Sequence, residues 1–238
     1  MRVHFVTACR NVSRNAAAIT RSLAEQTSDR WLWSVVDDAS SDDTSDAFAY
    51  EAHNQGVSRV SITRSDERKH ALRNIVETVR TSVEPGDIVA TLDGDDALCN
   101  PRTVEILLEA YSTPANDVVW TSHRWDTNGM NISRAMPDRV DPYAWPWVTS
   151  HLRTFRADLL SRVSDENFKD TKGEWFKRGY DQALMLPVLA VGKGRVHIPE
   201  VCYLYNIDSS SIPAAERDWS EVGQISTVNI VRARGFLE

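Results

Sequence analysis

Three carboxylates stand within four residues, directly after an apolar strand. The strand covers 88–92, and Asp93, Asp95 and Asp96 follow it with Gly94 between them. Like charges this close repel one another, and burying them without partners is costly. A divalent cation commonly holds such a cluster, and hard oxygen ligands suit Mg²⁺ or Mn²⁺, which also bind phosphates. The sequence therefore predicts a metal-dependent enzyme that acts on a nucleotide diphosphate compound.

The elements that must position these carboxylates alternate between strands and helices in the first half of the chain. Apolar runs and helical spacing predict strands over 3–8, 31–36, 57–63 and 88–92, and helices over 15–26, 44–54 and 67–81. Because such alternation is typical of βαβ units, we expect an α/β fold with a mostly parallel central sheet flanked by helices. Ligands bind beyond the carboxyl ends of the strands in such sheets. Polar residues gather at three of these ends, in residues 7–10, 37–38 and 93–96.

The second half of the chain is less regular. Its patterns predict helices over 101–111, 177–191 and 220–234, and strands over 117–122, 195–198 and 201–205. A long, weakly patterned loop covers 123–149, and residues 151–156 lead into a helix that ends at about Val163. Because no repeat and no linker interrupts the sequence, we expect a single domain over 1–238.

Composition excludes several classes of function. A net charge of −7 argues against a general phosphate-binding surface of the kind that nucleic-acid-binding proteins carry. Cys9, Cys99 and Cys202 form neither a zinc spacing nor a disulfide framework, which favours reduced cysteines. No signal peptide is evident and no apolar run reaches the ~18 residues of a membrane span, so we expect a cytoplasmic protein without stable membrane insertion.

Three segments together resemble one known family. Residues 35–44 (VVDDASSDDT) look like the VVDDGSTDGT segment of the family 2 glycosyltransferases, and 70–74 (HALRN) is similar to their ARN helix. Residues 92–96 (LDGDD) resemble their LDADD version of the DxD motif. The segments follow the family's order within residues 1–100. The second half matches more loosely, through 154–156 (TFR), 179–181 (GYD) and 203–206 (YLYN).

This resemblance implies a fold and a reaction. The family has the GT-A fold and transfers a sugar, with inversion, from a nucleotide diphosphate donor to an acceptor hydroxyl. It implies a nucleotide-sugar-binding half over 1–100, an acceptor-binding half over 101–238 and a Mn²⁺ or Mg²⁺ cofactor. On the family's frequency alone we expect a uridine diphosphate (UDP) sugar as donor. The acceptor hydroxyl belongs to a glycan, a protein or a modified nucleic acid.

The resemblance also assigns donor-binding roles to matching residues. Thr7 would line the base pocket, Asp38 with Asp37 would accept a hydrogen bond from the base, and Arg73 would approach the base or the diphosphate. In the DxD segment, Asp93 would bind the ribose side of the donor and the metal, Asp95 would ligate the metal, and Asp96 would lie near the donor sugar or support the metal shell.

On the acceptor side, Asp181 matches the family's general base. The family usually has Glu-Asp there, whereas Tyr180 precedes Asp181 in this chain. The chemistry requires such a carboxylate, because an acceptor hydroxyl is a poor nucleophile until a positioned base takes its proton. The metal-bound carboxylate cluster has a different role, because its cation stabilises the charge that develops on the leaving diphosphate.

Each assignment has a structural alternative. Asp37 and Asp38 are also typical of a solvated turn that caps a helix. Arg73 is also typical of the solvent-exposed face of a helix. Asp181 is equally the acid that a helix start favours.

Other residues leave the choice open. His151 either contacts the diphosphate, completes the metal shell or is a satisfied structural histidine. Trp125, Trp145 and Trp147 either stack on an acceptor sugar or pack in the core. Arg153, like Arg156, either meets phosphate or is a helix-surface charge.

Two rival functions were weighed against glycosyl transfer. A sugar nucleotidyltransferase would carry a glycine-rich phosphate loop after the first strand, but residues 9–14 contain no glycine. A catalytically inactive binder of nucleotide sugars or glycans would keep affinity and lack turnover, and the presence of both Asp95 and Asp181 argues against it.

Overall fold

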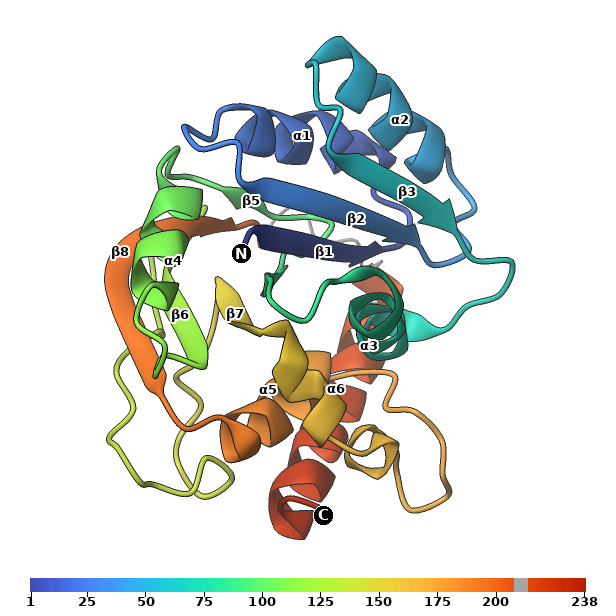
Figure 1. The fold of residues 1–238 in the computed structure, drawn as a ribbon. Helices are drawn as coiled ribbons and strands as arrows, with labels where there is room; N and C mark the ends of the chain where they lie inside the picture. The colour runs from blue at the N-terminus through green and yellow to red at the C-terminus, as the bar shows by residue number, and fades with distance from the viewer. Residues whose placement is uncertain (208–213) are drawn as a thin grey trace.

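A computed structural model describes the backbone of residues 1–207 and 214–238, and the side chains of 1–207 and 222–238. One eight-stranded sheet runs through the molecule in the order β3-β2-β1-β4-β7-β6-β8-β5 (Figure 1). The strands are β1 Val3–Cys9, β2 Trp31–Asp37, β3 Val60–Arg64, β4 Ile88–Thr91, β5 Ala97–Leu98, β6 Val118–Trp125, β7 Arg153–Arg156 and β8 Arg195–Tyr205. The α-helices are α1 Ala16–Ala24, α2 Thr44–Asn54, α3 His70–Ser82, α4 Thr103–Tyr111, α5 Tyr180–Val191 and α6 Ala214–Arg234, with short 3₁₀ helices at Ser13–Asn15, Ala157–Arg162 and Asp165–Phe168.

The first half forms the expected parallel sheet. β3 pairs with β2, β2 with β1 and β1 with β4, all in parallel. β1, β2 and β4 are almost wholly buried, as continuous apolar strands covered on both faces should be. Their carboxyl ends therefore meet at one edge of the sheet, where Cys9 and Asp37 end their strands and Asp93 follows β4.

The structure differs from the sequence prediction at residues 153–156. This segment is the strand β7, antiparallel to both β4 and β6, and residues 157–162 form a 3₁₀ helix instead of an α-helix. Open strand edges need partners for their N–H and C=O groups, and β4 finds one here. Thr91 at the end of β4 is paired with Arg153, so the arginine lies beside the acidic loop and not on a helix surface.

The two short strands predicted near the C-terminus are one long strand, β8. It includes Pro199, which cannot donate a ladder hydrogen bond. The parallel pairing of β8 with β6 shifts register between Trp120 and Ser122 and again between Ser122 and His123, and such irregularities accommodate a strand proline. The strand thereby continues to Tyr203 and Tyr205 without leaving the sheet.

Helices cover both faces of the sheet (Figure 1). One hydrophobic cluster joins the sheet to α1, α2 and α4, and a second joins it to α3, α5 and α6. Trp33 lies in the first cluster and Trp120 in the second, both fully buried. Among the helices of residues 1–207 and 214–238, none combines the length and apolar character needed to cross a membrane.

Gly194, in the turn before β8, offers a test of this packing. A Cβ added there would lie 1.7 Å from the carbonyl oxygen of Ala115. We expect Gly194→Ala to lower the free energy of unfolding by about 1–3 kcal/mol, because a backbone segment would have to move. Urea denaturation measures this loss.

The matched control is Gly86→Ala. A Cβ at Gly86 would meet no atom within 4 Å, so this substitution should change stability by no more than about 0.5 kcal/mol. Equal effects of the two substitutions would contradict the packing described for the start of β8.

Candidate active site

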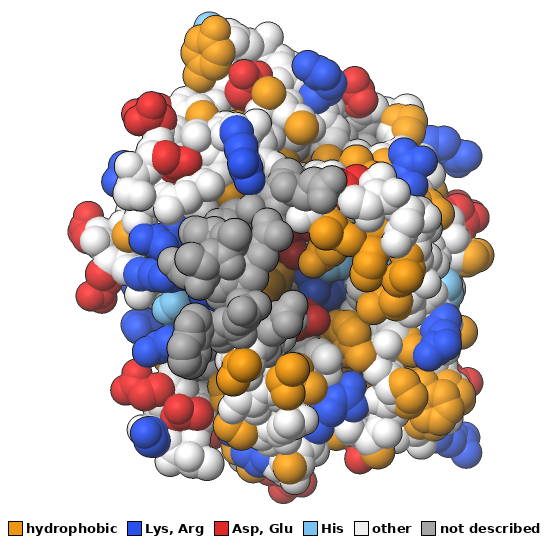
Figure 2. Space-filling model, turned by 180° about the vertical axis from the view of Figure 1, so that it is seen from behind, with side chains coloured by type: hydrophobic (Ala, Val, Ile, Leu, Met, Phe, Trp, Pro, Cys, Tyr) orange, Lys and Arg blue, Asp and Glu red, His pale blue; other side chains and the backbone are white. Residues whose placement is uncertain are grey.

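A cavity of about 650 Å³ opens at the carboxyl edge of the parallel strands. Its walls come from the loops after β1 and β4, from the start of α5 and from the segment after β8. Figure 2 shows a hollow on this face in which acidic, basic and histidine side chains are visible. The location agrees with the expectation that ligands bind beyond the carboxyl ends of such strands.

Seven of the residues that the sequence analysis selected line this cavity. They are Asp38, Asp93, Asp95, Asp96, Trp125, His151 and Asp181. Five others are absent from its walls, namely Thr7, Asp37, Arg73, Trp145 and Trp147.

The five residues outside the walls have other contacts. The hydroxyl of Thr7 accepts a hydrogen bond from Trp33 Nε1 at 2.9 Å, and Arg73 pairs with Glu77 at 2.6 Å. Asp37 is fully buried and accepts hydrogen bonds from the turn that begins α2, at 2.9 Å and 2.6 Å. Trp145 and Trp147 pack against the cluster around α3 and α5. For Arg73, Trp145 and Trp147 these contacts correspond to the structural alternatives given above, whereas Asp37 is buried and does not lie in a solvated turn.

Asp38 lies in the wall and also organises it. Its carboxylate accepts hydrogen bonds from the backbone N–H of Lys69 at 2.6 Å and of His70 at 3.0 Å, and from Asn74 Nδ2 at 2.9 Å. Because the first N–H groups of a helix lack intrahelical partners, these bonds satisfy the start of α3. Asp38 thus fixes α3 against the end of β2.

The acidic loop after β4 fits only with a glycine at its second position. A Cβ on Gly94 would lie 2.4 Å from the Cβ of Cys9, a separation that real structures do not show. The next backbone carbonyl, that of Asp95, accepts hydrogen bonds from Asn206 Nδ2 at 2.7 Å and from Asn15 Nδ2 at 3.3 Å. Segments far apart in the sequence therefore hold the loop that carries the three carboxylates.

Asp96 is the most buried of the three carboxylates. It is 2% exposed and accepts hydrogen bonds from Tyr203 Oη and from the Asn206 N–H, both at 2.8 Å. Burial raises the pKa of Asp96 well above its usual range, and the negative charges of Asp93 and Asp95 raise it further. A cation bound beside these carboxylates would remove that repulsion.

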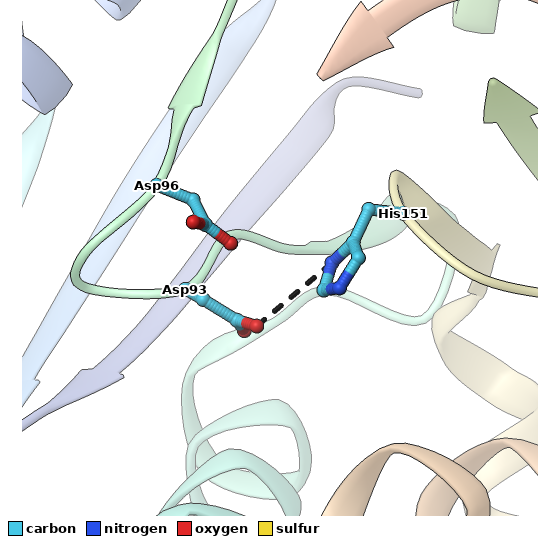
Figure 3. A group of neighbouring side chains, drawn as sticks. All are labelled: Asp93, Asp96 and His151. Carbon is cyan, nitrogen blue, oxygen red and sulfur yellow. Dashed lines mark ion pairs between the residues drawn. The ribbon is translucent and has the colours of Figure 1, made fainter. Parts of the chain in front are cut away.

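Arg153 supplies one buried positive charge to this cluster. Its side chain is 2% exposed, and Nη2 lies 3.2 Å from Asp93 Oδ2 and 3.2 Å from His151 Nδ1. Burial lowers the pKa of His151 well below its usual range, and Arg153 lowers it further. His151 is therefore neutral, and its 3.8 Å contact with Asp93 (dashed in Figure 3) is not an ion pair at neutral pH.

The residues present fit a divalent cation. One ligand atom each from Asp93, Asp96 and His151 lies within 4.8 Å of the other two, and the three side chains converge in Figure 3. Carboxylate oxygens and a neutral imidazole suit Mn²⁺ and also Mg²⁺. Asp95, the ligand that the sequence analysis favoured, lines the cavity but does not belong to this group of three.

Another part of the cavity wall is basic. Arg68, Lys177 and Arg178 line it, together with His70. Burial and the charges of Arg68, Arg178 and Lys177 lower the pKa of His70 to about 4, against the opposing charge of Asp38. A cavity lined by both carboxylates and cations suits a ligand with several phosphate oxygens.

Asp181 lies in the first turn of α5 and is partly exposed to the cavity. Burial raises its pKa, an effect that Arg153 only partly offsets. The preceding Gly179 has φ of +62°, a conformation open to glycine, and its backbone packs against Gln224 of α6. A carboxylate with a raised pKa, aimed at a cavity, is suited to accept a proton from a bound hydroxyl.

An aromatic series runs along another wall. The rings of His151 and Tyr203 stack with centroids 4.5 Å apart and 16° between planes. Tyr205 follows at 5.0 Å from His151, and Trp125 at 6.1 Å from Tyr205. Trp125 and Tyr205 line the cavity and present apolar surface to a ligand.

Arg153, Tyr180, Tyr203 and Asn206 all contact the acidic loop, and the sequence pattern assigns no role to the last three. For Arg153 it offers contact with phosphate or a helix-surface charge, and neither includes the contact with Asp93, because the segment was expected to lead into a helix. The available signals were the three loosely matching segments 154–156, 179–181 and 203–206, which lie beside or include these residues.

Removal of one cluster carboxylate tests the metal site. We expect Mn²⁺ at 100 times its dissociation constant to stabilise the wild-type protein by about 2.7 kcal/mol, which raises its melting temperature by a few degrees. Asp96→Asn should lose most of this increase, because a neutral amide replaces a buried carboxylate ligand. Thermal denaturation with and without Mn²⁺ measures it.

Glu105→Gln is the control, since this partly exposed residue lies outside the cavity. It should keep the wild-type response to Mn²⁺. A full response in Asp96→Asn would show that Asp96 does not contribute to the metal site.

Known proteins share this fold. TarS of S. aureus superposes with a TM-score of 0.67 and 14% identity over 94% of this chain and 43% of that chain. TarS 1–349 in complex with UDP-GlcNAc superposes with a TM-score of 0.66 and 15% sequence identity, over 100% of this chain and 68% of that chain. The mannosyltransferase PcManGT from Pyrobaculum calidifontis, in complex with GDP-Man and Mn²⁺, has a TM-score of 0.66 and 18% sequence identity. The match covers 96% of this chain and 64% of that chain.

These likenesses establish the fold, and the chain spans less than half of the full TarS chain. A comparison with curated protein sequences gave no match. The profile of glycosyl transferase family 2 matches residues 5–178, which is most of the chain. With its α/β sheet of the GT-A type, the chain belongs to glycosyl transferase family 2.

Proposed function

We propose that this protein is an inverting, metal-dependent glycosyltransferase that moves a sugar from a nucleotide diphosphate donor, a UDP-sugar, to an acceptor hydroxyl. The observation that carries the proposal is that one cavity contains both a carboxylate–imidazole cluster and a separate carboxylate, Asp181. Solved relatives of this fold carry UDP, UDP-GlcNAc, or GDP-Man with Mn²⁺, which supports a nucleotide-sugar donor.

The donor half of the proposal covers residues 1–100. Asp93 and Asp96 of this half, together with His151 from the second half of the chain, would hold the divalent cation, with Asp95 in the same cavity. When bound, the cation stabilises the charge that develops on the leaving diphosphate.

Around the donor, the basic wall would add positive charge. Arg68, Lys177 and Arg178 face the same cavity, so they can neutralise phosphate oxygens that the cation does not reach. Asp38 lies in the wall where the family resemblance puts the base, and its carboxylate, which accepts three hydrogen bonds from residues 69–74, would order that part of the wall. Thr7 and Asp37 would support the strand ends behind it through the hydrogen bonds described above.

The acceptor half covers residues 101–238. Asp181 would take the proton of the acceptor hydroxyl as that oxygen attacks the anomeric carbon. A single displacement inverts the configuration and needs no covalent sugar–enzyme intermediate, so one base on the acceptor side is sufficient.

The acceptor would meet the aromatic wall. Trp125 and Tyr205 offer faces on which a sugar ring can stack, whereas Trp145 and Trp147 pack against the core. The hydroxyl can belong to a glycan, a protein or a modified nucleic acid.

Asp181→Asn tests the assignment of the base. We expect the dissociation constant of UDP-GlcNAc with Mn²⁺ to stay within about threefold of wild type, because Asp181 does not belong to the metal cluster. Transfer should fall about 10²- to 10⁴-fold, the usual contribution of a general base. Calorimetry and UDP release measure the two quantities.

Full turnover in Asp181→Asn would place the base elsewhere. Donor binding without any turnover in the wild-type protein would instead identify it as a nucleotide-sugar binder. GDP-Man serves as the second donor in both measurements.

The pH dependence of transfer gives an independent check. Because burial raises the pKa of Asp181, the proton-accepting form is lost at a higher pH than for an ordinary aspartate. Transfer by the wild-type protein should therefore fall on acidification through that raised pKa. The residual activity of Asp181→Asn should not show this acid limb, which pH–rate profiles of kcat measure.

A further inference from the structure

We propose that Tyr180 and Arg153 form a positioning network that fixes Asp181 relative to the donor-binding loop. The network consists of Tyr180, Arg153 and Asp93. The inference rests on the proposed function, because it assumes that Asp181 acts on the acceptor. It adds Tyr180 and Arg153, which are outside the metal cluster, as residues that set the distance between the metal cluster and Asp181.

The Tyr180 hydroxyl uses both of its hydrogen-bonding functions. It accepts a hydrogen bond from Arg153 Nη2 at 2.9 Å and donates one to Asp93 Oδ1. Arg153 Nη2 is also 3.2 Å from Asp93 Oδ2, and its guanidinium carbon lies 5.2 Å from the centre of the Tyr180 ring. The three side chains therefore form a closed triangle of contacts between β7, the loop after β4 and the start of α5.

Contacts with Thr91 in the sheet fix Arg153, and Arg153 in turn fixes the other two residues of the triangle. Its Nε donates to Thr91 Oγ1 at 3.2 Å, and its backbone is paired with Thr91 in the sheet. A buried arginine always carries its charge, which requires compensation by an anion such as Asp93. The position of Tyr180 is thus set by the sheet, through Arg153.

The start of α5 needs this support. Its N-cap residue, Gly179, has a left-handed conformation and makes no side-chain cap hydrogen bond. One other side-chain contact of the first turn is the hydrogen bond from Arg232 Nε to Gln182 Oε1, at 2.8 Å. Tyr180 directly precedes Asp181, so the contact of its hydroxyl with Asp93 ties the proposed base to the donor loop.

The network also gives a physical reason why this chain has Tyr180 where the family usually has the glutamate of a Glu-Asp pair. A glutamate here would add another carboxylate beside Asp93 and compete for the same guanidinium. Tyrosine instead supplies a neutral donor to Asp93. In this chain the residue before the base therefore joins the two centres without adding charge.

Tyr180→Phe removes the hydroxyl and leaves the ring in place. In the protein without ligands, we expect amide exchange in the first turn of α5 to rise by up to about tenfold, since lost hydrogen bonds lower the local cost of opening. Hydrogen–deuterium exchange over residues 180–184 measures this. Tyr111→Phe is the control, because that buried hydroxyl bonds to Thr154 Oγ1 and the Val119 N–H, away from the cavity.

The activity measurement uses UDP-GlcNAc and GDP-Man with Mn²⁺ as probes. Tyr180→Phe should lower kcat for nucleoside diphosphate release about 10- to 100-fold, as small misplacements of catalytic groups do, and leave the donor dissociation constant within about threefold. In an Asp181→Asn background, Tyr180→Phe should have no further effect on kcat, because its contribution acts through Asp181.

The outcomes separate the possibilities. Increased exchange together with non-additive kinetics supports the proposal. Unchanged exchange at α5, or an additive loss of kcat in the double variant, overturns it. If the wild-type protein releases no nucleoside diphosphate, the proposed function fails, and the exchange comparison alone decides whether the network holds α5.

A second variant covers the case in which Tyr180→Phe does not fold. Arg153→Lys keeps the charge and loses the planar donor group that reaches both Tyr180 and Asp93. It should raise exchange over the same turn. Wild-type exchange in a folded Arg153→Lys protein would overturn the proposal.

Discussion

A buried guanidinium beside a strand-end carboxylate is the interaction on which the rest of the site depends. Among the described residues, five carboxylates line one cavity, in Asp38, Asp93, Asp95, Asp96 and Asp181, and Arg153 is a buried cation that contacts Asp93. Without Arg153 the loop after β4 would hold like charges in a poorly solvated place. With it, part of that negative charge is compensated within the protein.

This constraint explains why so many neutral donors surround the acidic loop. Tyr203, Asn206 and Asn15 donate hydrogen bonds to the carboxylate of Asp96 or to backbone carbonyls, and none of them adds a charge. Donors of this kind fix the loop while leaving its electrostatic potential negative. Arg68 and Arg178 belong to the basic part of the cavity wall, and Arg68 Nε lies 4.0 Å from Asp38 Oδ2, so that part also balances a wall carboxylate.

The features that could be predicted from the sequence depend on residues close together in the chain, whereas those that could not depend on contacts between distant residues. Elements of the parallel half and the acidic loop depend on local patterns, and the predicted strands at 3–8, 31–36 and 88–92 agree with the structure within one residue at each end. The partners of Asp93 lie 60 and 87 positions away, at Arg153 and Tyr180. Their roles depend on β7 pairing with β4, and a four-residue strand carries too little periodicity to reveal this.

The insertion of β7 beside β4 has a consequence for how the chain folds. Thr91 and Arg153 are 62 residues apart, and the sheet cannot close until the segment between them has been ordered. Loop-closure entropy opposes such distant pairing, so folding should be slower than for a protein of local contacts. A nascent chain of only the first hundred residues would therefore expose the edge of β4 on which β7 later pairs. Early contact with a chaperone would protect that edge from aggregation.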